Sequence, residues 1–180
     1  MPERGLRRWL LERAMNPEQA RRAPFLSRSP LFAGLPRRML GRLATRFLEK
    51  AYHAGEVVFH EGDPGRALFV VAEGTVEITQ TTSRGEYVVR TLGAGDAFGE
   101  LALIDEAPRS GSARVAGPTR LLILYKTDFD ALVEGNDRIA LAVLRNLLRA
   151  LAAYTRRAAV AGEEPASLGR PDGDGRGARQ

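Results

Sequence analysis

The stretch ALFVVAEGTVEITQ, residues 67–80, contains two short apolar runs that a Glu-Gly pair separates. In the second run apolar and polar residues alternate, which places Val76 and Ile78 on one face of an extended chain and Glu77 on the other. Short runs of this kind on either side of a glycine turn are typical of antiparallel strands. We therefore predict two adjacent strands whose apolar faces lie inside a β domain.

Similar runs continue on both sides of this hairpin, from Tyr52 to Tyr125. They are rich in Val, Ile, Phe, Leu and Thr, and they comprise residues 57–59, 86–91, 112–116 and 120–125. Regularly spaced short strands with turns between them indicate an antiparallel sandwich or barrel. We expect a mainly β fold with flanking helices, in which a β-roll or jelly roll of about eight strands covers about residues 52–126.

Helices are expected between the N-terminus and the roll. A basic amphipathic helix is predicted over residues 4–15, and a second small helix over 17–23, because Pro17 suits a first helical position. A packed helix is predicted over 37–49. Its apolar stripe comprises Met39, Leu40, Leu43, Phe47 and Leu48. For the basic helix, packing on its own domain is favoured over contact with an anionic membrane or a partner.

Two further helices are expected after the roll. The first ends at Gly135 and carries the apolar residues Phe129, Leu132 and Val133. The second covers about 137–160, with Asn136 as its N-cap. Its apolar stripe consists of Ile139, Val143, Leu147, Leu151 and Tyr154, widened by Leu144 and Leu148. This helix is longer than the roll needs for coverage, so part of the stripe is expected to face a ligand or a second subunit.

These segments divide the chain into three parts. Residues 1–28 form a basic helical segment, and residues 29–160 form the domain, whose C-terminal helices occupy about 127–160. Residues 161–180 are rich in Gly, Pro and charge and are expected to be disordered.

Composition limits the classes of function. The formal net charge is +5, but the basic excess lies near the N-terminus and in the long C-terminal helix, so a nucleic-acid surface would have to lie on flanking helices. The chain has no cysteine, which excludes disulfides, thiolate metal sites and thiol nucleophiles. The apolar runs are too short to cross a bilayer, and the N-terminal stretch lacks the features of a secretory signal. We expect a soluble, cytoplasmic protein.

The longest connection within the predicted roll, residues 98–112, reads FGELALIDEAPRSGS. Its carboxylate, Glu100, can accept hydrogen bonds from a sugar hydroxyl, and its guanidinium, Arg109, can bind a phosphate through two parallel donors. Gly99 leads into a predicted helical turn whose free backbone N–H groups could point at the same phosphate. The connection suits a small anion with hydroxyls and needs no metal. The alternative is an ordinary Glu–Arg salt bridge on a loop.

This connection resembles the phosphate-binding cassette of cyclic nucleotide-binding domains, the sensors of catabolite activators, protein kinase A regulatory subunits and cyclic nucleotide-gated channels. The phrase SPLFAGLP, residues 29–36, resembles the entry to the helical cap of those domains. The resemblance implies that Glu100 binds the ribose 2′-hydroxyl and Arg109 the exocyclic phosphate oxygens. It gives the remaining phosphate contacts to Gly99, the backbone N–H groups near Leu101 and Ala102, and the hydroxyl of Ser110. Gly111 stands where alanine is more usual, and we expect it to loosen the turn without removing a contact.

The same resemblance implies that the long C-terminal helix closes over the purine as a lid and often pairs with a second copy. Candidates for the purine contact are Arg149, Leu151, Tyr154 and Thr155. For Tyr154, packing in the core or in a dimer is favoured over contact with the base. Closure would shift a conformational equilibrium, because the ligand binds the closed arrangement more tightly.

We therefore expect a non-enzymatic sensor that binds cAMP in preference to cGMP and signals through its flanking helices to an effector protein. The alternative is a ligand-free β-roll that acts as a docking scaffold. Catalysis and metal binding are not expected, because the two histidines, His53 and His60, lie in no metal-binding pattern, and nucleophile-elbow and phosphate-loop motifs are absent. No helix-turn-helix is expected, because only the Gly-rich segment follows Val160.

Overall fold

The computed structural model describes residues 17–105, 107–135 and 137–161. The predicted helix over 4–15, Asn136 as N-cap and the predicted tail beyond Ala161 lie outside this part of the chain.

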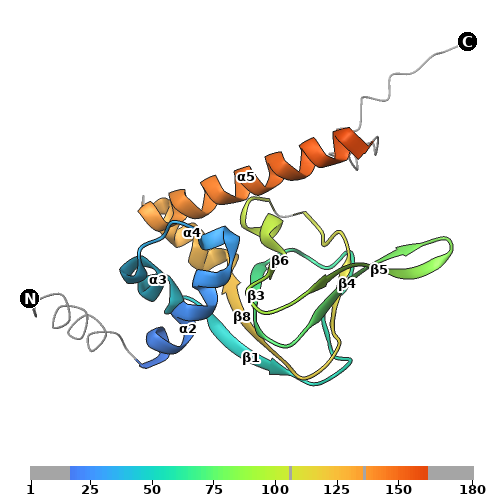
Figure 1. The fold of residues 1–180 in the computed structure, drawn as a ribbon, viewed down its shortest axis with the longest axis horizontal. Coiled ribbons are helices and arrows are strands. Elements are labelled where there is room, and N and C mark those ends of the chain that lie inside the picture. Colours follow the sequence, from blue (N-terminus) through green and yellow to red (C-terminus); the bar gives the residue numbers. More distant parts are fainter. Residues whose placement is uncertain (1–16, 106, 136, 162–180) are drawn as a thin grey trace, which may run out of the picture.

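Two antiparallel four-stranded sheets pack into a roll, which confirms the predicted fold class (Figure 1). The strands are β1 (Leu48–Tyr52), β2 (Val57–Phe59), β3 (Ala67–Glu73), β4 (Val76–Thr82), β5 (Gly85–Leu92), β6 (Ala97–Phe98), β7 (Ser112–Val115) and β8 (Thr119–Tyr125). One sheet has the order β1-β8-β3-β6 and the other β2-β7-β4-β5. The two runs of residues 67–80 lie in different sheets, as β3 and β4, so they are consecutive strands but not hydrogen-bonded neighbours.

The helices are α2 (Pro17–Arg28), α3 (Arg37–Ala44), α4 (Lys126–Glu134) and α5 (Arg138–Ala161), with the 3₁₀ turns η1 (Pro30–Phe32) and η2 (Glu100–Leu103). The helix predicted over 17–23 extends to Arg28. The two C-terminal helices agree with the prediction, except that Val133 of α4 is 41% exposed and does not belong to its packed face. Within the described helices, none is both long and apolar enough to span a membrane.

The helix predicted over 37–49 is wrong in its second half. Helix α3 ends at Ala44, and Leu48 begins strand β1, where it pairs with Ile123 of β8. The side chain of Leu48 is 55% exposed, so it does not continue the buried stripe of the helix. The pairing of β1 with β8 at the edge of the sheet overrides the local helical periodicity.

Strands β3 and β8 separate two hydrophobic cores because both of their faces are buried. Leu68 and Val70 of β3 face the helices, together with Leu122 and Leu124 of β8. The residues that alternate with them along the two strands face the interior of the roll; these are Phe69, Val71, Leu121 and Ile123. This double burial explains why both strands read as continuous apolar runs rather than as alternating ones.

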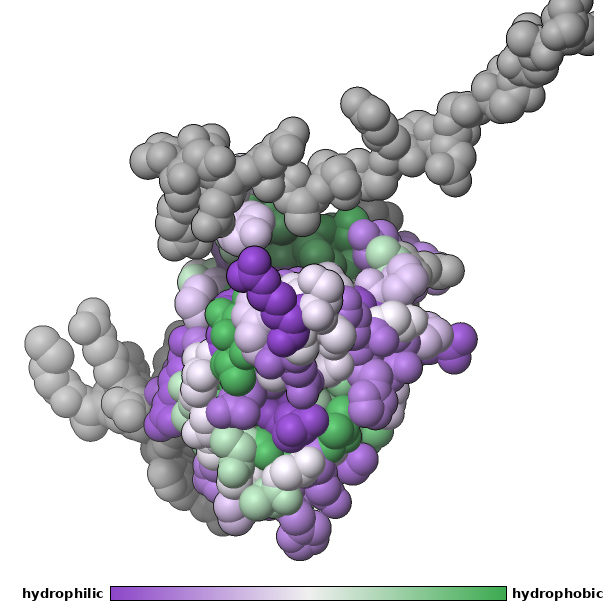
Figure 2. All heavy atoms as spheres, turned by 90° about the vertical axis from the view of Figure 1, so that its right-hand side faces the viewer, coloured by the Kyte–Doolittle hydropathy of each residue, from purple (hydrophilic) through white to green (hydrophobic). Residues whose placement is uncertain are grey.

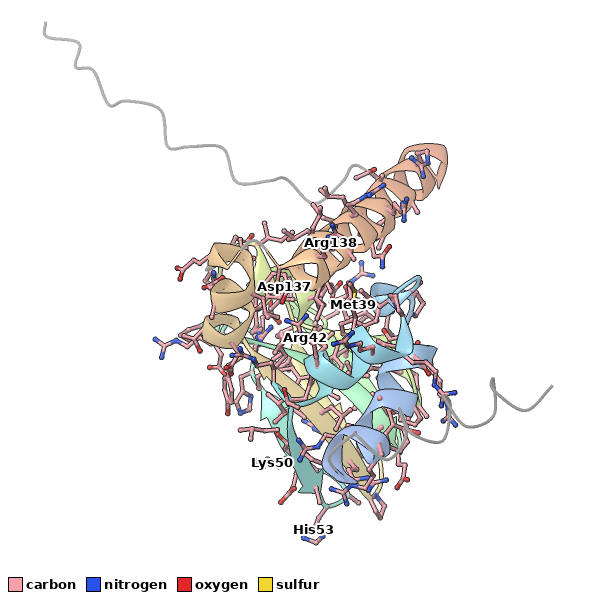
Figure 3. The ribbon with its side chains drawn as sticks, turned by 90° about the vertical axis from the view of Figure 1, so that its left-hand side faces the viewer. Met39, Arg42, Lys50, His53, Asp137 and Arg138 are labelled. Carbon is pink, nitrogen blue, oxygen red and sulfur yellow. The ribbon has the colours of Figure 1, made fainter. Side chains whose placement is uncertain are left out.

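The first half of α5 is fixed to the N-terminal helical layer by polar contacts. The side-chain amide of Asn146 donates to the carbonyl oxygens of Leu31 and Ala33, at 3.0 and 2.9 Å. Arg42 of α3 pairs with Asp137, at 2.6 Å, where α5 begins (Figure 3). Beyond Asn146, the helix continues over the roll (Figure 1).

Replacement of Asn146 by leucine tests this attachment. The variant loses both of these hydrogen bonds and the exposed one that Asn146 accepts from Arg149, and it leaves two carbonyl oxygens without their donor. The free energy of unfolding should therefore fall by about 1–3 kcal/mol. Urea denaturation monitored by circular dichroism measures the change. The neighbouring exposed residue provides the control, since Arg145→Leu should change stability by less than about 0.5 kcal/mol. Equal effects of the two substitutions would contradict the attachment.

Candidate functional site

The side chain of Arg109 is held by backbone carbonyl oxygens from two other segments. Its Nη2 donates to the carbonyl of Ala67 at 2.7 Å, and its Nη1 to the carbonyl of Gly99 at 3.1 Å. Its main chain pairs with the loop between β2 and β3, because its N–H donates to the carbonyl of Asp63 at 2.8 Å and its carbonyl accepts from Gly62 at 2.9 Å. These contacts fix both the backbone and the head group of Arg109.

An aromatic cluster lies against the guanidinium. The Cζ atom of Arg109 is 4.2 Å from the ring centroid of Phe59 and 5.6 Å from that of Phe69. Phe69 is stacked on Phe98, with 5.1 Å between the centroids. Cations within about 6 Å of a ring centroid are attracted by its quadrupole, so these rings stabilise the charge of Arg109.

The charge of Arg109 is only partly balanced. Burial lowers the pKa of Arg109, whereas the charges of Glu100 and Asp63 act in the opposite direction. Among the described residues no carboxylate forms an ion pair with it, and its buried Nε has no hydrogen-bond partner. A guanidinium with unused donors in a partly buried position is suited to bind an anion.

Glu100 begins the turn η2, directly after Gly99. Gly99 has a φ of +69°, and a Cβ at this position would lie 2.5 Å from Nη1 of Arg109. Only glycine therefore permits both the left-handed backbone and the close approach of the arginine. Glu100 and Arg109 do not form the salt bridge that the alternative interpretation required.

The other predicted cassette residues have different environments. Leu101 is 42% exposed, whereas Ala102 is buried and its N–H already donates to the Gly99 carbonyl at 3.3 Å. Ser110 is exposed, and its carbonyl accepts from the side-chain amide of Gln80 at 2.9 Å. The Leu101 N–H and the Ser110 hydroxyl thus have no partner within the described part of the chain, whereas the Ala102 N–H does.

Gly111 does not loosen the turn, contrary to our expectation. It is buried, and a Cβ at this position would lie 2.6 Å from the carbonyl oxygen of Thr79 in β4. The glycine therefore allows a close approach between the backbones of the cassette and β4.

The purine candidates on α5 point in different directions. Tyr154 follows Leu147 by seven residues and shares its stripe, yet Leu147 is 1% exposed and Tyr154 is 59% exposed. The core-facing side of α5 thus extends beyond the core, and packing of Tyr154 in the core of this chain is ruled out. Arg149 lies about 140° around the helix from Tyr154 and donates to Asn146. Leu151 is partly buried and Thr155 is exposed.

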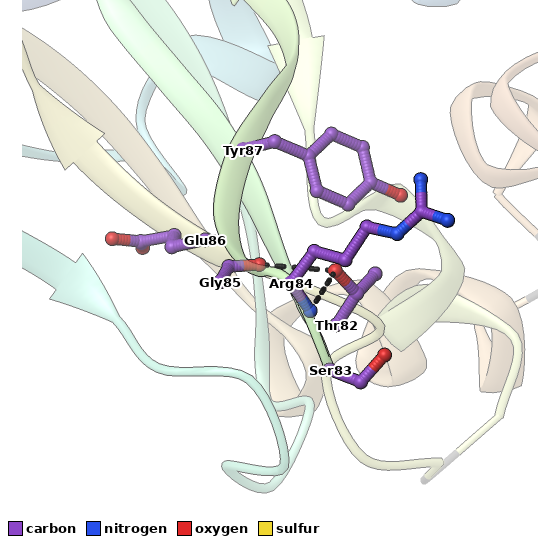
Figure 4. Close-up of a pocket in the computed structure, with 6 residues that line it drawn as sticks. All are labelled: Thr82, Ser83, Arg84, Gly85, Glu86 and Tyr87. Atoms are coloured by element: carbon purple, nitrogen blue, oxygen red, sulfur yellow. Dashed lines mark hydrogen bonds between the residues drawn. The ribbon is translucent and has the colours of Figure 1, made fainter.

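The surface hollow at the β4–β5 hairpin does not coincide with the cassette. A hollow at the tip of the β4–β5 hairpin is lined by residues 82–87 (Figure 4). It is formed by the hairpin turn, in which the Thr82 hydroxyl donates to the Gly85 carbonyl, and it contains no cassette residue. Recessed hydrophobic surface also appears near the top of the molecule, at the level where α5 passes over the roll (Figure 2). The cassette, and not the hairpin hollow, is therefore the candidate site.

Sequence reasoning missed three contributors to the site. Phe59 was placed correctly in a strand, but nothing in the sequence indicated that its ring lies against Arg109. Asp63 and Ala67 contribute carbonyl oxygens, which any residue type supplies. A Gly-Asp-Pro-Gly turn at residues 62–65 was the available signal that this loop adopts a defined shape.

Comparisons with known proteins agree on one family. The model of the cyclic nucleotide-binding domain matches residues 49–136. A cyclic AMP receptor protein from Thermus thermophilus is 39% identical over 131 residues, which cover 72% of this chain and 59% of that protein. The N-terminal domain of a transcriptional regulator from Streptomyces coelicolor A3(2) superposes with a TM-score of 0.67 and 34% identity over 72% of this chain and 94% of that chain. The regulatory domain of Toxoplasma gondii PKA, solved with cAMP, gives a TM-score of 0.58 and 32% identity over 63% of this chain and 43% of that chain.

Replacement of Gly111 by alanine tests the close approach to β4. The added methyl group meets a backbone carbonyl, so the sheet must shift, and the free energy of unfolding should fall by about 1–3 kcal/mol. Thermal or urea denaturation measures this change in the free energy of unfolding. Gly117→Ala is the matched control, because a Cβ there meets nothing within 4 Å and the variant should be neutral or slightly stabilised. Unchanged stability of Gly111→Ala would show that the turn is loose after all.

Proposed function

The chain belongs to the family of cyclic nucleotide-binding domains, and we therefore propose that it is a non-enzymatic sensor of a 3′,5′-cyclic purine mononucleotide. The observation that carries the proposal is the state of Arg109. Its guanidinium is oriented by two carbonyl oxygens and an aromatic ring, it has no ion-pair partner among the described residues, and Glu100 stands at the start of the adjacent turn. This arrangement offers a cation to a phosphate and a carboxylate to a sugar.

In the proposed complex, the remaining in-plane donors of Arg109 bind the exocyclic oxygens of the cyclic phosphate. Glu100 accepts a hydrogen bond from the ribose 2′-hydroxyl, and the Leu101 N–H and the Ser110 hydroxyl bind further phosphate oxygens. Because the N–H of Ala102 is already used within η2, it contributes only if this turn rearranges. Gly99 and Gly111 act by permitting close backbone approach.

The ligand proposed first is cAMP. Two of the similar proteins carry cAMP in their names, the Thermus receptor and the Toxoplasma kinase domain. The hydroxyl of Ser110 suits a phosphate or a guanine equally, so the cassette itself does not select the base. Tyr154 is the candidate for the base contact. It lies on the core-facing stripe of α5, two turns after the buried Leu147, and its side chain is exposed.

The signal is proposed to pass through α5. A nucleotide that binds more tightly when α5 is closed over it shifts the population toward that arrangement. The polar contacts of Asn146 and Asp137 join α5 to the N-terminal helices, so movement of one affects the other. Leu141 and Leu148 lie seven residues apart on one side of α5 and are 59% and 61% exposed. They form an apolar surface on which a second copy or an effector protein could pack.

Calorimetry against cAMP, cGMP and their linear 5′-monophosphates tests the proposed ligand class. Arg109→Leu should weaken binding of the cyclic nucleotide by about 2–4 kcal/mol, because it removes a charge-assisted double contact. Glu100→Gln should reduce the preference for cAMP over its 2′-deoxy analogue. Arg114→Leu is the matched control, since Arg114 lies on the exposed side of β7 and should leave affinity unchanged.

Two results would contradict the proposal. Failure of the folded wild-type protein to bind any cyclic nucleotide at millimolar concentration would favour the ligand-free docking scaffold. An Arg109→Leu variant whose affinity falls by less than about threefold would remove Arg109 as the phosphate anchor.

A pair of α5 variants tests the base contact. Loss of the ring in Tyr154→Ala should raise the Kd of the cyclic purine nucleotide about tenfold, because stacking of an aromatic side chain on a base contributes about 1–3 kcal/mol. Arg149→Ala should leave the Kd unchanged, since this residue lies on the other side of the helix. Titration of a fluorescent cyclic nucleotide measures both. The reverse order of effects would assign the contact to Arg149.

A further inference from the structure

We propose that Phe59 is a positioning residue for Arg109: its ring supports the guanidinium in the orientation that binds a phosphate, so that nucleotide affinity depends on Phe59 through Arg109. The inference rests on the proposed function. It concerns a residue outside the cassette, forty positions before Gly99 in the sequence and on a different sheet from β3 and β6.

The position of the ring is set by the fold. Phe59 ends β2 and pairs with Ala113 of β7, so its Cβ is fixed by the sheet. Its ring packs against Phe69 and Phe98, with centroid distances of 5.6 and 6.0 Å. Phe69 and Phe98 are 7% and 3% exposed, which leaves the cluster little freedom to rearrange. The guanidinium therefore meets a preformed aromatic surface, with its Cζ 4.2 Å from the centroid of Phe59.

An aromatic ring holds a guanidinium in a way that leaves it free to bind an anion. A carboxylate at the same place would occupy the in-plane donors and neutralise the charge. The ring attracts the cation through its face and uses none of the five N–H groups. The carbonyls of Ala67 and Gly99 each accept from one terminal nitrogen, so further donors remain in the plane. Phe59 thus restricts the orientation of Arg109 without competing with a phosphate.

Three single variants separate positioning from general packing. Phe59→Leu keeps an apolar side chain but removes the ring, and it should raise the Kd of the cyclic nucleotide about fivefold to tenfold. Phe59→Tyr keeps the aromatic face and should remain within about twofold of the wild type. Phe25→Leu is the matched control, because the ring of Phe25 lies 5.4 Å from Cζ of another arginine, Arg120, outside the cassette. It should not change the Kd.

A double-mutant cycle with Arg109→Leu shows whether Phe59 acts through the arginine. In the Arg109→Leu background, Phe59→Leu should cause no further loss of affinity, since there is no guanidinium left to position. An equal loss in both backgrounds would overturn the inference, because Phe59 would then act on the ligand directly or through the fold. Wild-type affinity of Phe59→Leu would overturn it as well.

A spectroscopic measurement on the ligand-free protein tests the contact independently of binding. In the NMR spectrum, the side-chain N–H signals of Arg109 should be shifted upfield by the ring current in the wild type and in Phe59→Tyr, and should move toward ordinary values in Phe59→Leu. Unchanged Arg109 signals in Phe59→Leu would overturn the inference even if the protein binds no cyclic nucleotide. Failure of the wild type to bind, with the expected shifts present, would instead contradict only the proposed function.

Discussion

The guanidinium of Arg109 connects three segments that are distant in the sequence. Its hydrogen bonds reach the first residue of β3, at Ala67, and the residue that precedes η2, at Gly99. Its backbone is paired with the loop after β2 through Asp63. Because a partly buried cation without hydrogen-bond partners is costly, these contacts stabilise the observed position of the cassette on the roll. One of these hydrogen bonds reaches the residue directly before Glu100, so the arginine also supports the start of η2.

The roll and the helices meet at a single sheet. Strands β3 and β8 contribute to the core under the helices with one face and to the core of the roll with the other. The same β3 begins at the carbonyl that holds Arg109 and packs against η2 beside it. The cassette and the helical layer thus share β3, while the hydrogen bonds of Asn146 join that layer, at Leu31 and Ala33, to α5.

The sequence was sufficient where local chemistry decides the structure. Repeated short apolar runs predicted six of the strands and the roll, and the cassette motif predicted the turn that begins at Glu100, directly after Gly99. The sequence was not sufficient to predict the structure where strand pairing or close packing between distant segments determines it. Strand β1 was assigned to a helix because Phe47 and Leu48 continue a helical period, and Gly111 was interpreted as loose because its neighbour across the sheet was unknown. The ring of Phe59 could not be placed against Arg109 without the register of β2.

The two-sided burial of β8 has a consequence for how this chain can change. Neighbouring positions along the strand pack in different cores. Leu122 and Leu124 contact the core under the helices, whereas Leu121 and Ile123 contact the core inside the roll. A displacement of the strand by one residue would exchange the two sets at once. Substitution of Leu122 or Leu124 can therefore change the packing of the helices while the residues that line the inside of the roll stay the same.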